Sequence, residues 1–276
     1  MSETTERVRK VWDDQANSWY AERESMLAAS RPVHEWLVTH VDPKPGQRLL
    51  EIGAGTGDTG FLASRLLGDG RLVSTDLAPS MVEVARKRGG ELGISNVEYR
   101  VLDAQAMDFA DASFDGVIGR WVFMLMPDPA AAFRECRRVL KPRGRLVAAV
   151  FTGPDENPWV SIPVRVLREA GHLPPPTGDW QPGILALADR SRLKALLDGA
   201  GFTSTAIERI DMAWTFAGAD DYWKFLVEVT ALGPLLRDLP DAERRVVRAS
   251  IEARVASVSD ASGITLPAQC WGGLAM

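Results

Sequence analysis

Acidic residues end three short apolar runs in the first half of the chain. Glu51 follows Leu49 and Leu50, Asp76 follows residues 72–75, and Asp103 follows residues 97–102. If these runs are parallel strands, their carboxyl ends meet at one edge of a sheet, where ligands of such sheets bind. Carboxylates accept hydrogen bonds from hydroxyl, amino and ammonium groups. A single Asp would fit a helix cap or a turn equally well, but three in succession predict a site for a small polar ligand.

A glycine-rich stretch, E-I-G-A-G-T-G-D-T-G, follows the first of these runs and precedes a helical pattern over residues 61–67. Glycine reaches positive φ at little cost and lets a ligand approach the backbone. The N-terminus of the following helix favours an anionic ligand group. The dinucleotide fingerprint requires a glycine where this chain has Asp58, and the phosphate loop requires G-K-S/T, whereas Gly60 is followed by Phe61. Both of those ligand classes are therefore disfavoured.

The pattern E-x-G-x-G-x-G resembles that of the class I S-adenosylmethionine-dependent methyltransferases. Two further stretches, F-D-G-V-I-G-R-W-V-F-M-L-M-P-D-P from residue 114 and R-R-V-L-K-P-R-G-R-L from residue 137, are similar to the ubiquinone/menaquinone-biosynthesis subgroup, methyltransferase type 11. The resemblance is specific from Arg48 to Val150 and weak outside. One departure is Arg143–Gly144, where the family usually has Gly-Gly.

The resemblance implies S-adenosylmethionine as the cofactor, with S-adenosylhomocysteine as its product. It assigns Glu51 to the ammonium end of the cofactor, Asp76 to both ribose hydroxyls and Asp103 to the adenine amino group. The predicted cofactor-binding residues are Tyr20, Glu51, Gly53, Ala54, Gly55, Gly57, Asp76, Leu77, Met81, Asp103, Ala104, Arg120 and Trp121.

Arg120 and Trp121 end the fourth expected strand and are placed beside the methionine end of the cofactor and the methyl acceptor. An aromatic face attracts a sulfonium cation, although Trp121 could instead be a core residue. Tyr20, at the end of an N-terminal amphipathic helix, is assigned with Arg120 to the cofactor carboxylate or to an acidic acceptor.

The alternation of strand and helix patterns predicts a doubly wound parallel sheet. The fold class we expect is α/β: Rossmann-like, with a mostly parallel seven-stranded sheet, an antiparallel C-terminal hairpin and a helical cap. The number of strands and the antiparallel hairpin are expected from the family resemblance. Expected strands cover residues 49–52, 72–75, 97–102, 114–119, 145–151, 203–216 and 264–276, and expected helices cover residues 4–29, 31–41, 61–67, 79–89, 129–140, 160–170, 190–199, 220–232 and 241–258, with a turn at 141–144.

This pattern divides the chain into a core and three additions. Residues 1–45 are expected to close over the cofactor, and residues 46–151 and 189–276 to form the core. The Pro-rich segment 152–188 and the helical segment 217–260 are expected to cap the acceptor pocket. The alternative for the second segment is a partner-binding helical pair, which would allow a homodimer.

Methyl transfer from a sulfonium is an in-line displacement that needs alignment and at most one base. His172, in the first cap segment, is our first candidate for that base and His34 the second. A lone histidine is more often a surface or packing residue. If the acceptor is an acidic phenol, orientation alone suffices and no base is needed.

Composition and sequence motifs argue against nucleic acid, a membrane span and a metal ion as partners. The formal net charge of -5 leaves no basic surplus for nucleic acid, and the Asn/Asp-Pro-Pro-Tyr motif of nucleic-acid amino methyltransferases is missing after the fourth strand. No apolar run is long enough to span a bilayer, residues 1–10 lack a signal core, and Cys136 and Cys270 match no metal-site spacing. We therefore expect a cytoplasmic protein with a small-molecule partner and no metal.

The leading hypothesis is a methyltransferase acting on an oxygen or carbon of a small, largely apolar, cyclic acceptor. The alternatives are a cofactor-retaining enzyme that catalyses another reaction such as a cyclisation, a nicotinamide-dependent oxidoreductase, which Asp58 disfavours, and a non-catalytic cofactor-binding subunit.

Overall fold

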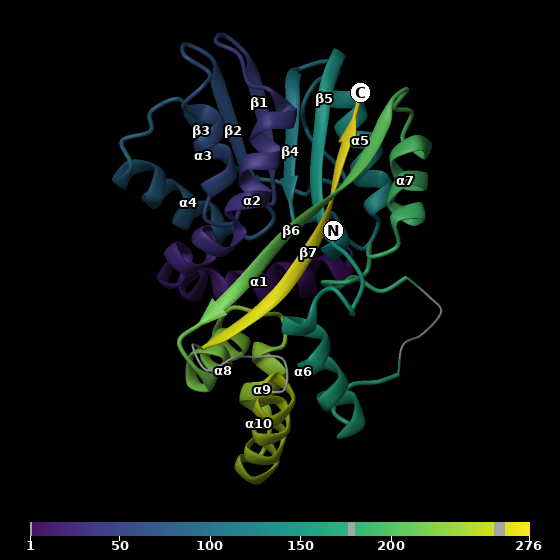
Figure 1. The fold of residues 1–276 in the computed structure, drawn as a ribbon. Coiled ribbons are helices and arrows are strands. Elements are labelled where there is room, and N and C mark those ends of the chain that lie inside the picture. Colours follow the sequence, from purple (N-terminus) through teal and green to yellow (C-terminus); the bar gives the residue numbers. More distant parts are fainter. Residues whose placement is uncertain (1, 176–179, 257–262) are drawn as a thin grey trace.

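A computed structural model describes residues 2–175, 180–256 and 263–276, which build a sheet flanked by helices (Figure 1). The strands are β1 (Arg48–Ile52), β2 (Arg71–Asp76), β3 (Val97–Val101), β4 (Phe114–Arg120), β5 (Leu140–Phe151), β6 (Thr205–Phe216) and β7 (Ile264–Ala275). The helices are α1 (Glu3–Ala21), α2 (Arg23–Val41), α3 (Asp58–Ser64), α4 (Pro79–Glu91), the 3-10 turn η1 (Phe123–Leu125), α5 (Pro129–Val139), α6 (Pro158–Glu169), α7 (Arg190–Gly199), α8 (Ala219–Glu228), α9 (Gly233–Asp238) and α10 (Asp241–Ala256).

The seven strands lie in the order β3-β2-β1-β4-β5-β7-β6. Strands β1 to β5 run parallel to one another, while β7 runs antiparallel to both β5 and β6. The order reverses between β1 and β4, which is where ligands bind in doubly wound sheets. The predicted fold class, including the antiparallel C-terminal hairpin, is confirmed.

Several predicted boundaries are wrong, among them those of α3, which covers Asp58–Ser64 and not residues 61–67. Helix α2 begins at Arg23 and contains Pro32 in its interior, although the sequence pattern placed its start at residue 31. The predicted turn at 141–144 lies within β5, where Arg143 has φ 66° and the pairing with β4 shifts register. The predicted helix 220–232 is divided into α8 and α9. Residues 176–179 and 257–260 of the predicted caps lie outside the described residues.

Adjacent glycines in β7 show how closely helices cover both faces of the sheet. A Cβ on Gly272 would lie 2.8 Å from Trp36 of α2, and a Cβ on Gly273 would lie 3.4 Å from Leu197 of α7. Because successive residues of a strand point to opposite faces, α2 and α7 cover opposite faces of the sheet.

Helix α1 crosses the sheet near the carboxyl ends of the parallel strands, and α6, α8, α9 and α10 gather beyond it (Figure 1). The long strands β6 and β7 extend from the parallel part of the sheet to this helical group. The fold therefore brings segments from both ends of the chain to the edge where the site is expected. Within the described ranges, no helix is both long enough and apolar enough to cross a bilayer.

Two helical glycines differ in the space around them and provide a stability test. A Cβ on Gly60 in α3 would lie 2.1 Å from Glu51 Oε2 and 2.7 Å from Leu72 Cδ2, whereas a Cβ on Gly90 in α4 meets nothing within 4 Å. We expect Gly60→Ala to lower the free energy of unfolding by about 1–3 kcal/mol through overpacking. Gly90→Ala should raise it by up to about 1 kcal/mol, because alanine is the better helix former. Urea denaturation of both variants checks this, and an equal effect of the two changes would contradict it.

Candidate functional site

A cavity opens at the carboxyl ends of β1, β2 and β4, at the reversal of strand order. Its empty volume, including space open to solvent, is about 770 Å³. It is lined by Val8, Trp12, Trp19, Gly53, Gly55, Asp76, Leu77, Met81, Leu102, Ala104, Gln105, Arg120, Trp121, Val122, Leu125, Met126 and Pro127. Among these residues Asp76 and Arg120 carry charge, and the remainder are almost all apolar.

The glycine-rich turn forms the floor of this cavity. Gly53 and Gly55 have φ 59° and 56°, a backbone region that glycine adopts at little cost. A Cβ on Gly53 would also come within 2.3 Å of Val122 Cγ2. Glycine at this position thus keeps the turn and β4 close together and leaves the cavity open to the backbone.

Asp76, at the end of β2, is held by the same turn. Its Oδ2 accepts a hydrogen bond from the N–H of Gly55 at 2.9 Å, and its Oδ1 accepts one from the N–H of Ala78 at 3.0 Å. The backbone of Leu77 also interacts favourably with this carboxyl, and because a carboxylate has about four lone-pair sites, acceptor capacity remains for a donor in the cavity. Burial raises the pKa of Asp76 to about 6, against the opposing effect of the backbone hydrogen bonds from Ala78 and Gly55.

Glu51 does not line the cavity, and its role at the ammonium end of the cofactor remains a prediction. Its side chain is buried, with Oε1 accepting from the N–H of Gly60 at 2.7 Å and Oε2 accepting from Ser74 Oγ at 3.1 Å. Burial raises the pKa of this carboxyl to about 7. Glu51 ties the first turn of α3 to β1 and β2.

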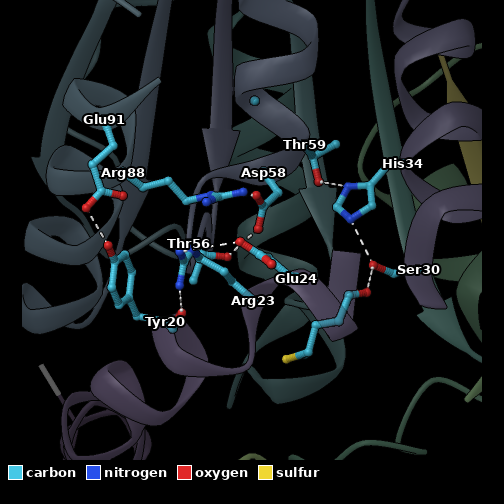
Figure 2. A network of polar contacts seen from close by, with 12 residues as sticks. Tyr20, Arg23, Glu24, Ser30, His34, Thr56, Asp58, Thr59, Arg88 and Glu91 are labelled. Atoms are coloured by element: carbon cyan, nitrogen blue, oxygen red, sulfur yellow. Dashed lines mark hydrogen bonds and ion pairs between the residues drawn. The ribbon is translucent and has the colours of Figure 1, made fainter. Parts of the chain in front are cut away.

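Asp58, which replaces a glycine of the dinucleotide fingerprint, belongs to a second buried network (Figure 2). It accepts from Thr56 Oγ1 at 2.6 Å and pairs with Arg88 Nε at 2.8 Å. The pair joins α3 to α4, and Asp58 also lies in the first turn of α3, where a negative charge is favourable. Its role is to fix the helix that follows the glycine-rich turn.

Arg120 lines the cavity without a protein partner for its charge. Among the described residues no direct ion pair or hydrogen bond is formed by its guanidinium, and its Nε is buried without a partner. Its guanidinium carbon lies 4.5 Å from the centre of the Trp121 ring. Burial lowers the pKa of Arg120, an effect that Asp58 and Glu51 oppose through their charges. Because burial disfavours this charge and no direct ion pair compensates it, an anionic ligand group in the cavity is a partner that this position fits.

Some of the other predicted cofactor-binding residues line the cavity and others do not. Leu77, Met81 and Ala104 line the cavity, and Gly53 and Gly55 form part of its wall. Asp103, Ala54 and Gly57 do not line it, and one oxygen of Asp103 accepts from both the backbone and side-chain N–H groups of Gln105. Tyr20 points away from it, because its hydroxyl bonds to Glu91 of α4 and its ring contacts Arg23 and Lys87.

Neither predicted base reaches the cavity. His34 is buried between Ser30 and Thr59, 2.9 Å from each hydroxyl oxygen (Figure 2). Because Ser30 Oγ donates to the carbonyl of Met26, it accepts from His34 Nε2–H, which leaves Nδ1 to accept from Thr59. Burial, followed by the charge of Arg120, lowers the pKa of His34 to about 2. His34 is therefore a neutral structural histidine.

His172 follows α6 and lies beside α10. Its Nε2 is 3.5 Å from Glu243 Oε2 of α10, and it lines neither the first cavity nor the second one described next. The geometry gives it a place in the packing of the cap and none in proton transfer.

A second cavity adjoins the first and shares Trp12, Trp19, Trp121 and Leu125 with it. Its empty volume is about 450 Å³. The remaining lining residues are Met26, Met124, Phe151, Trp159, Ile184, Trp214, Phe225, Val229, Thr230 and Ala231. They come from α2, η1, β5, β6 and both predicted caps, so the caps and the N-terminal helices meet around one aromatic space.

Trp121 separates the two cavities in a strained conformation. Its φ of 57° is unusual for a bulky residue. The conformation is held by hydrogen bonds from its N–H to the carbonyl of Ala149 at 2.8 Å and from Nε1 to Cys270 Sγ at 3.2 Å, and the ring stacks on Phe151 at 4.7 Å. Such strain persists where the surroundings fix it, typically at functional sites.

Sequence reasoning missed most of the apolar lining, including Val8, Leu102, Val122, Leu125 and Met126. Leu102 and Gln105, which flank the predicted Asp103 and Ala104, could have been included from their position after β3. The aromatic residues of β6 and α8 gave no local signal, because only the fold brings them to the cavity.

Comparisons with known proteins agree with this geometry. Residues 50–148 match the family model described as methyltransferase domain. The ubiquinone/menaquinone biosynthesis C-methyltransferase UbiE of Klebsiella pneumoniae (strain 342) is 34% identical over 169 residues, which cover 58% of this chain and 67% of that protein. The chain belongs to the S-adenosylmethionine-dependent methyltransferases. It is an enzyme of that class, and S-adenosylmethionine is its cofactor.

Solved structures confirm the fold of this methyltransferase. The YcgJ protein of Bacillus subtilis is 19% identical and superposes with a TM-score of 0.61, covering 88% of this chain and 96% of its own. The cyclase SpnF is 22% identical with a TM-score of 0.54, covering 88% of this chain and 80% of its own. At these identities the likeness concerns the fold alone.

The buried carboxyl of Glu51 gives a prediction for stability against pH. Its pKa is raised from 4.5 to about 7 in the folded protein, so the folded state binds more protons than the unfolded state between these values, and stability falls as pH rises through the window. Glutamine can accept from Gly60 and donate to Ser74 without titrating. We expect the free energy of unfolding of the wild type, relative to Glu51→Gln, to fall by up to about 3 kcal/mol across this range. Urea denaturation at several pH values measures the difference, and parallel profiles would contradict the prediction.

Proposed function

We propose that this methyltransferase acts on an oxygen or carbon of a small, largely apolar, cyclic acceptor. The observation that carries the proposal is the aromatic second cavity, which shares a wall with the first at Trp121 and Leu125. A displacement needs the acceptor held close to the methyl group and in line with the departing sulfur. A cavity adjoining the cofactor cavity supplies such a position.

The proposed cofactor placement follows from the charges in the first cavity. Asp76 retains acceptor capacity for the two ribose hydroxyls, and the apolar side chains of Leu102 and Ala104 suit the adenine ring, with Met81 on the wall nearby. Arg120, buried and without an ion partner among the described residues, suits the carboxylate of the methionine end. This arrangement leaves the sulfur end towards Trp121 and Leu125, where the cavities adjoin.

A cofactor-retaining reaction such as a cyclisation is the second candidate. It is favoured by the walls of the second cavity, which contain no acid or base among the described residues. A cyclisation consumes no methyl donor, so formation of S-adenosylhomocysteine during turnover distinguishes the two candidates.

Substitutions at Arg120 and Asp76 test the cofactor placement with two ligands. 5′-Methylthioadenosine has the adenosine and sulfur of S-adenosylhomocysteine and lacks its amino acid. Arg120→Met should weaken binding of S-adenosylhomocysteine by about 10- to 100-fold, as expected for lost hydrogen bonds to a charged group, and leave 5′-methylthioadenosine unaffected. Asp76→Asn should weaken both ligands, because both contain the ribose. Isothermal titration calorimetry measures the four affinities.

The stability of the free protein provides the control. Replacing an unpaired buried charge by an apolar side chain of similar size should leave the free energy of unfolding of Arg120→Met equal to or above that of the wild type. Equal loss of affinity for both ligands in this variant would assign Arg120 to another part of the site and contradict the placement.

Asp76 also predicts how binding depends on pH. Because its pKa is raised to about 6 and the ionised form accepts from both hydroxyls, affinity for 5′-methylthioadenosine should be constant above this value. Below it, affinity should fall by about tenfold per pH unit, as protonation competes with binding. The Asp76→Asn variant should show no such fall. Calorimetric titrations of both proteins across this range check the prediction, and an identical fall in the variant would assign the dependence to another group.

A further inference from the structure

The second cavity differs from an ordinary polar active site in the chemistry of its walls. Seven of its fourteen lining residues are aromatic, namely Trp12, Trp19, Trp121, Phe151, Trp159, Trp214 and Phe225. None of the fourteen is a His, Cys, Lys, Tyr, Asp or Glu. The hydroxyl of its Thr230 is engaged, because it donates to the carbonyl of Leu226 at 2.7 Å and accepts from the N–H of Leu232. The walls can therefore hold an apolar ring but cannot remove a proton from it.

Two polar groups of this cavity's walls are also occupied by contacts between α1 and the cap. Gln15 donates to the carbonyl of Thr230 at 2.7 Å, and Trp19 Nε1 donates to the carbonyl of Val229 at 2.8 Å. Trp214 Nε1 is a wall donor that is buried without a partner, and it can donate a hydrogen bond but cannot accept a proton. A ligand that fits therefore directs its ionised group towards the first cavity, past Trp121 and Leu125.

The charges in the first cavity, beyond Trp121 and Leu125, favour a negatively charged acceptor group. In the described lining of the first cavity, Arg120 and Asp76 cancel in formal charge, and the proposed cofactor adds one net positive charge from its ammonium, carboxylate and sulfonium groups. A cationic acceptor would be repelled at this position, while an anion would be attracted through a medium of low dielectric constant. Because no wall residue can generate that anion, the acceptor must ionise in water before it binds.

Building on the proposed function, we infer that the second cavity binds an apolar ring bearing an acidic hydroxyl, a phenol or an enol, as its oxyanion, and that the methyl group is transferred to the oxygen. The hydroxyl proton leaves to water before binding. The oxyanion then forms a bond to the methyl carbon as the carbon–sulfur bond breaks, and that electron pair remains on sulfur. The products are a neutral methyl ether and a neutral thioether, so no further proton transfer is needed.

Methylation at carbon is disfavoured by the same walls. A ring carbon that accepts a methyl group keeps its hydrogen and must lose it as a proton to restore the aromatic ring. No described residue of the second cavity can accept that proton. Oxygen is therefore the atom that this cavity allows to react without a base.

Binding of ring probes to the full chain tests the inference without requiring turnover. The probes are 1-nitro-2-naphthol, at a pH above the pKa of its own hydroxyl, and 2-methoxynaphthalene, which has the same ring system and no charge. The protein is loaded either with sinefungin, whose amine places a positive charge near the methyl position, or with S-adenosylhomocysteine, which has none there. We expect the naphtholate to bind the sinefungin complex at least about tenfold more tightly than the other complex, and the methoxy probe to bind both equally.

A matched pair of variants locates the probe. Leu125 lines both cavities, and Leu125→Glu adds a negative charge at their junction, whereas Leu125→Gln adds a side chain of the same size without charge. We expect the naphtholate to lose at least about tenfold more affinity in the glutamate variant than in the glutamine variant. The methoxy probe should distinguish the two variants little. Sinefungin affinity in each variant, measured in the same titrations, reports on the integrity of the first cavity.

The outcomes separate this inference from the proposed function. Equal affinity of the naphtholate for both complexes, or no binding of either ring probe to a protein that binds sinefungin, would overturn the inference and leave the cofactor site intact. A methyl group on ring carbon in the product from 1-nitro-2-naphthol and S-adenosylmethionine would also overturn it. Failure to bind both sinefungin and S-adenosylhomocysteine would instead remove the proposed function itself.

Discussion

Two carboxylates, the buried Glu51 and the half-buried Asp76, hold the glycine-rich turn, and the position of the site depends on them. Asp76 accepts from the N–H of Gly55 on one side of the turn, and Glu51 accepts from the N–H of Gly60 on the other. Burying each carboxyl is unfavourable for its charge, as their raised pKa values indicate, but each satisfies a backbone N–H that would otherwise be buried without a partner. The turn is thereby fixed to β1 and β2 at the point where the strand order reverses. The two acids are similar in sequence context and differ in role, because Asp76 keeps free acceptor sites in the cavity whereas Glu51 points inward.

The sequence predicted the parts of the site that depend on local pattern. The glycine positions and the acid after β2 follow from the order of strand, turn and helix, because a parallel sheet places the ends of neighbouring strands together, whereas Met81 and Ala104 were implied by the family resemblance. Arg120 and Trp121 were likewise found from their position at the end of β4. Glu51 does not line the cavity because its oxygens accept hydrogen bonds from Gly60 and Ser74. Tyr20 points away from the cavity because its position on α1 directs its side chain towards Glu91 of α4. Trp19, its neighbour, faces the cavity instead.

The second cavity could not be predicted in the same way. Trp214, Phe225 and Val229 meet Trp12 and Trp19 only after β6 and β7 have extended past the parallel strands and α1 has crossed below them. These contacts join residues about two hundred positions apart, and no local periodicity specifies them. The sequence contains nine tryptophans against three tyrosines, but composition does not show which of the tryptophans meet in the fold. The two histidines were predicted as bases from their residue type alone. In the structure both ring nitrogens of His34 are hydrogen-bonded within the protein, and His172 packs beside α10.

Helix α1 contributes Trp12 and Trp19 to the walls of both cavities. Asp13 accepts from the N–H of Ser80 at the start of α4, beside Met81 of the first cavity. Gln15 and Trp19 bond to residues 230 and 229, which line the second cavity. The helix thus rests beside the first cavity through one face and closes the second through another. A ligand that displaced α1 from α4 would also open the aromatic cavity to water. Because an apolar cavity gains its binding energy from excluding water, the seating of α1 on α4 also helps to keep the second cavity enclosed.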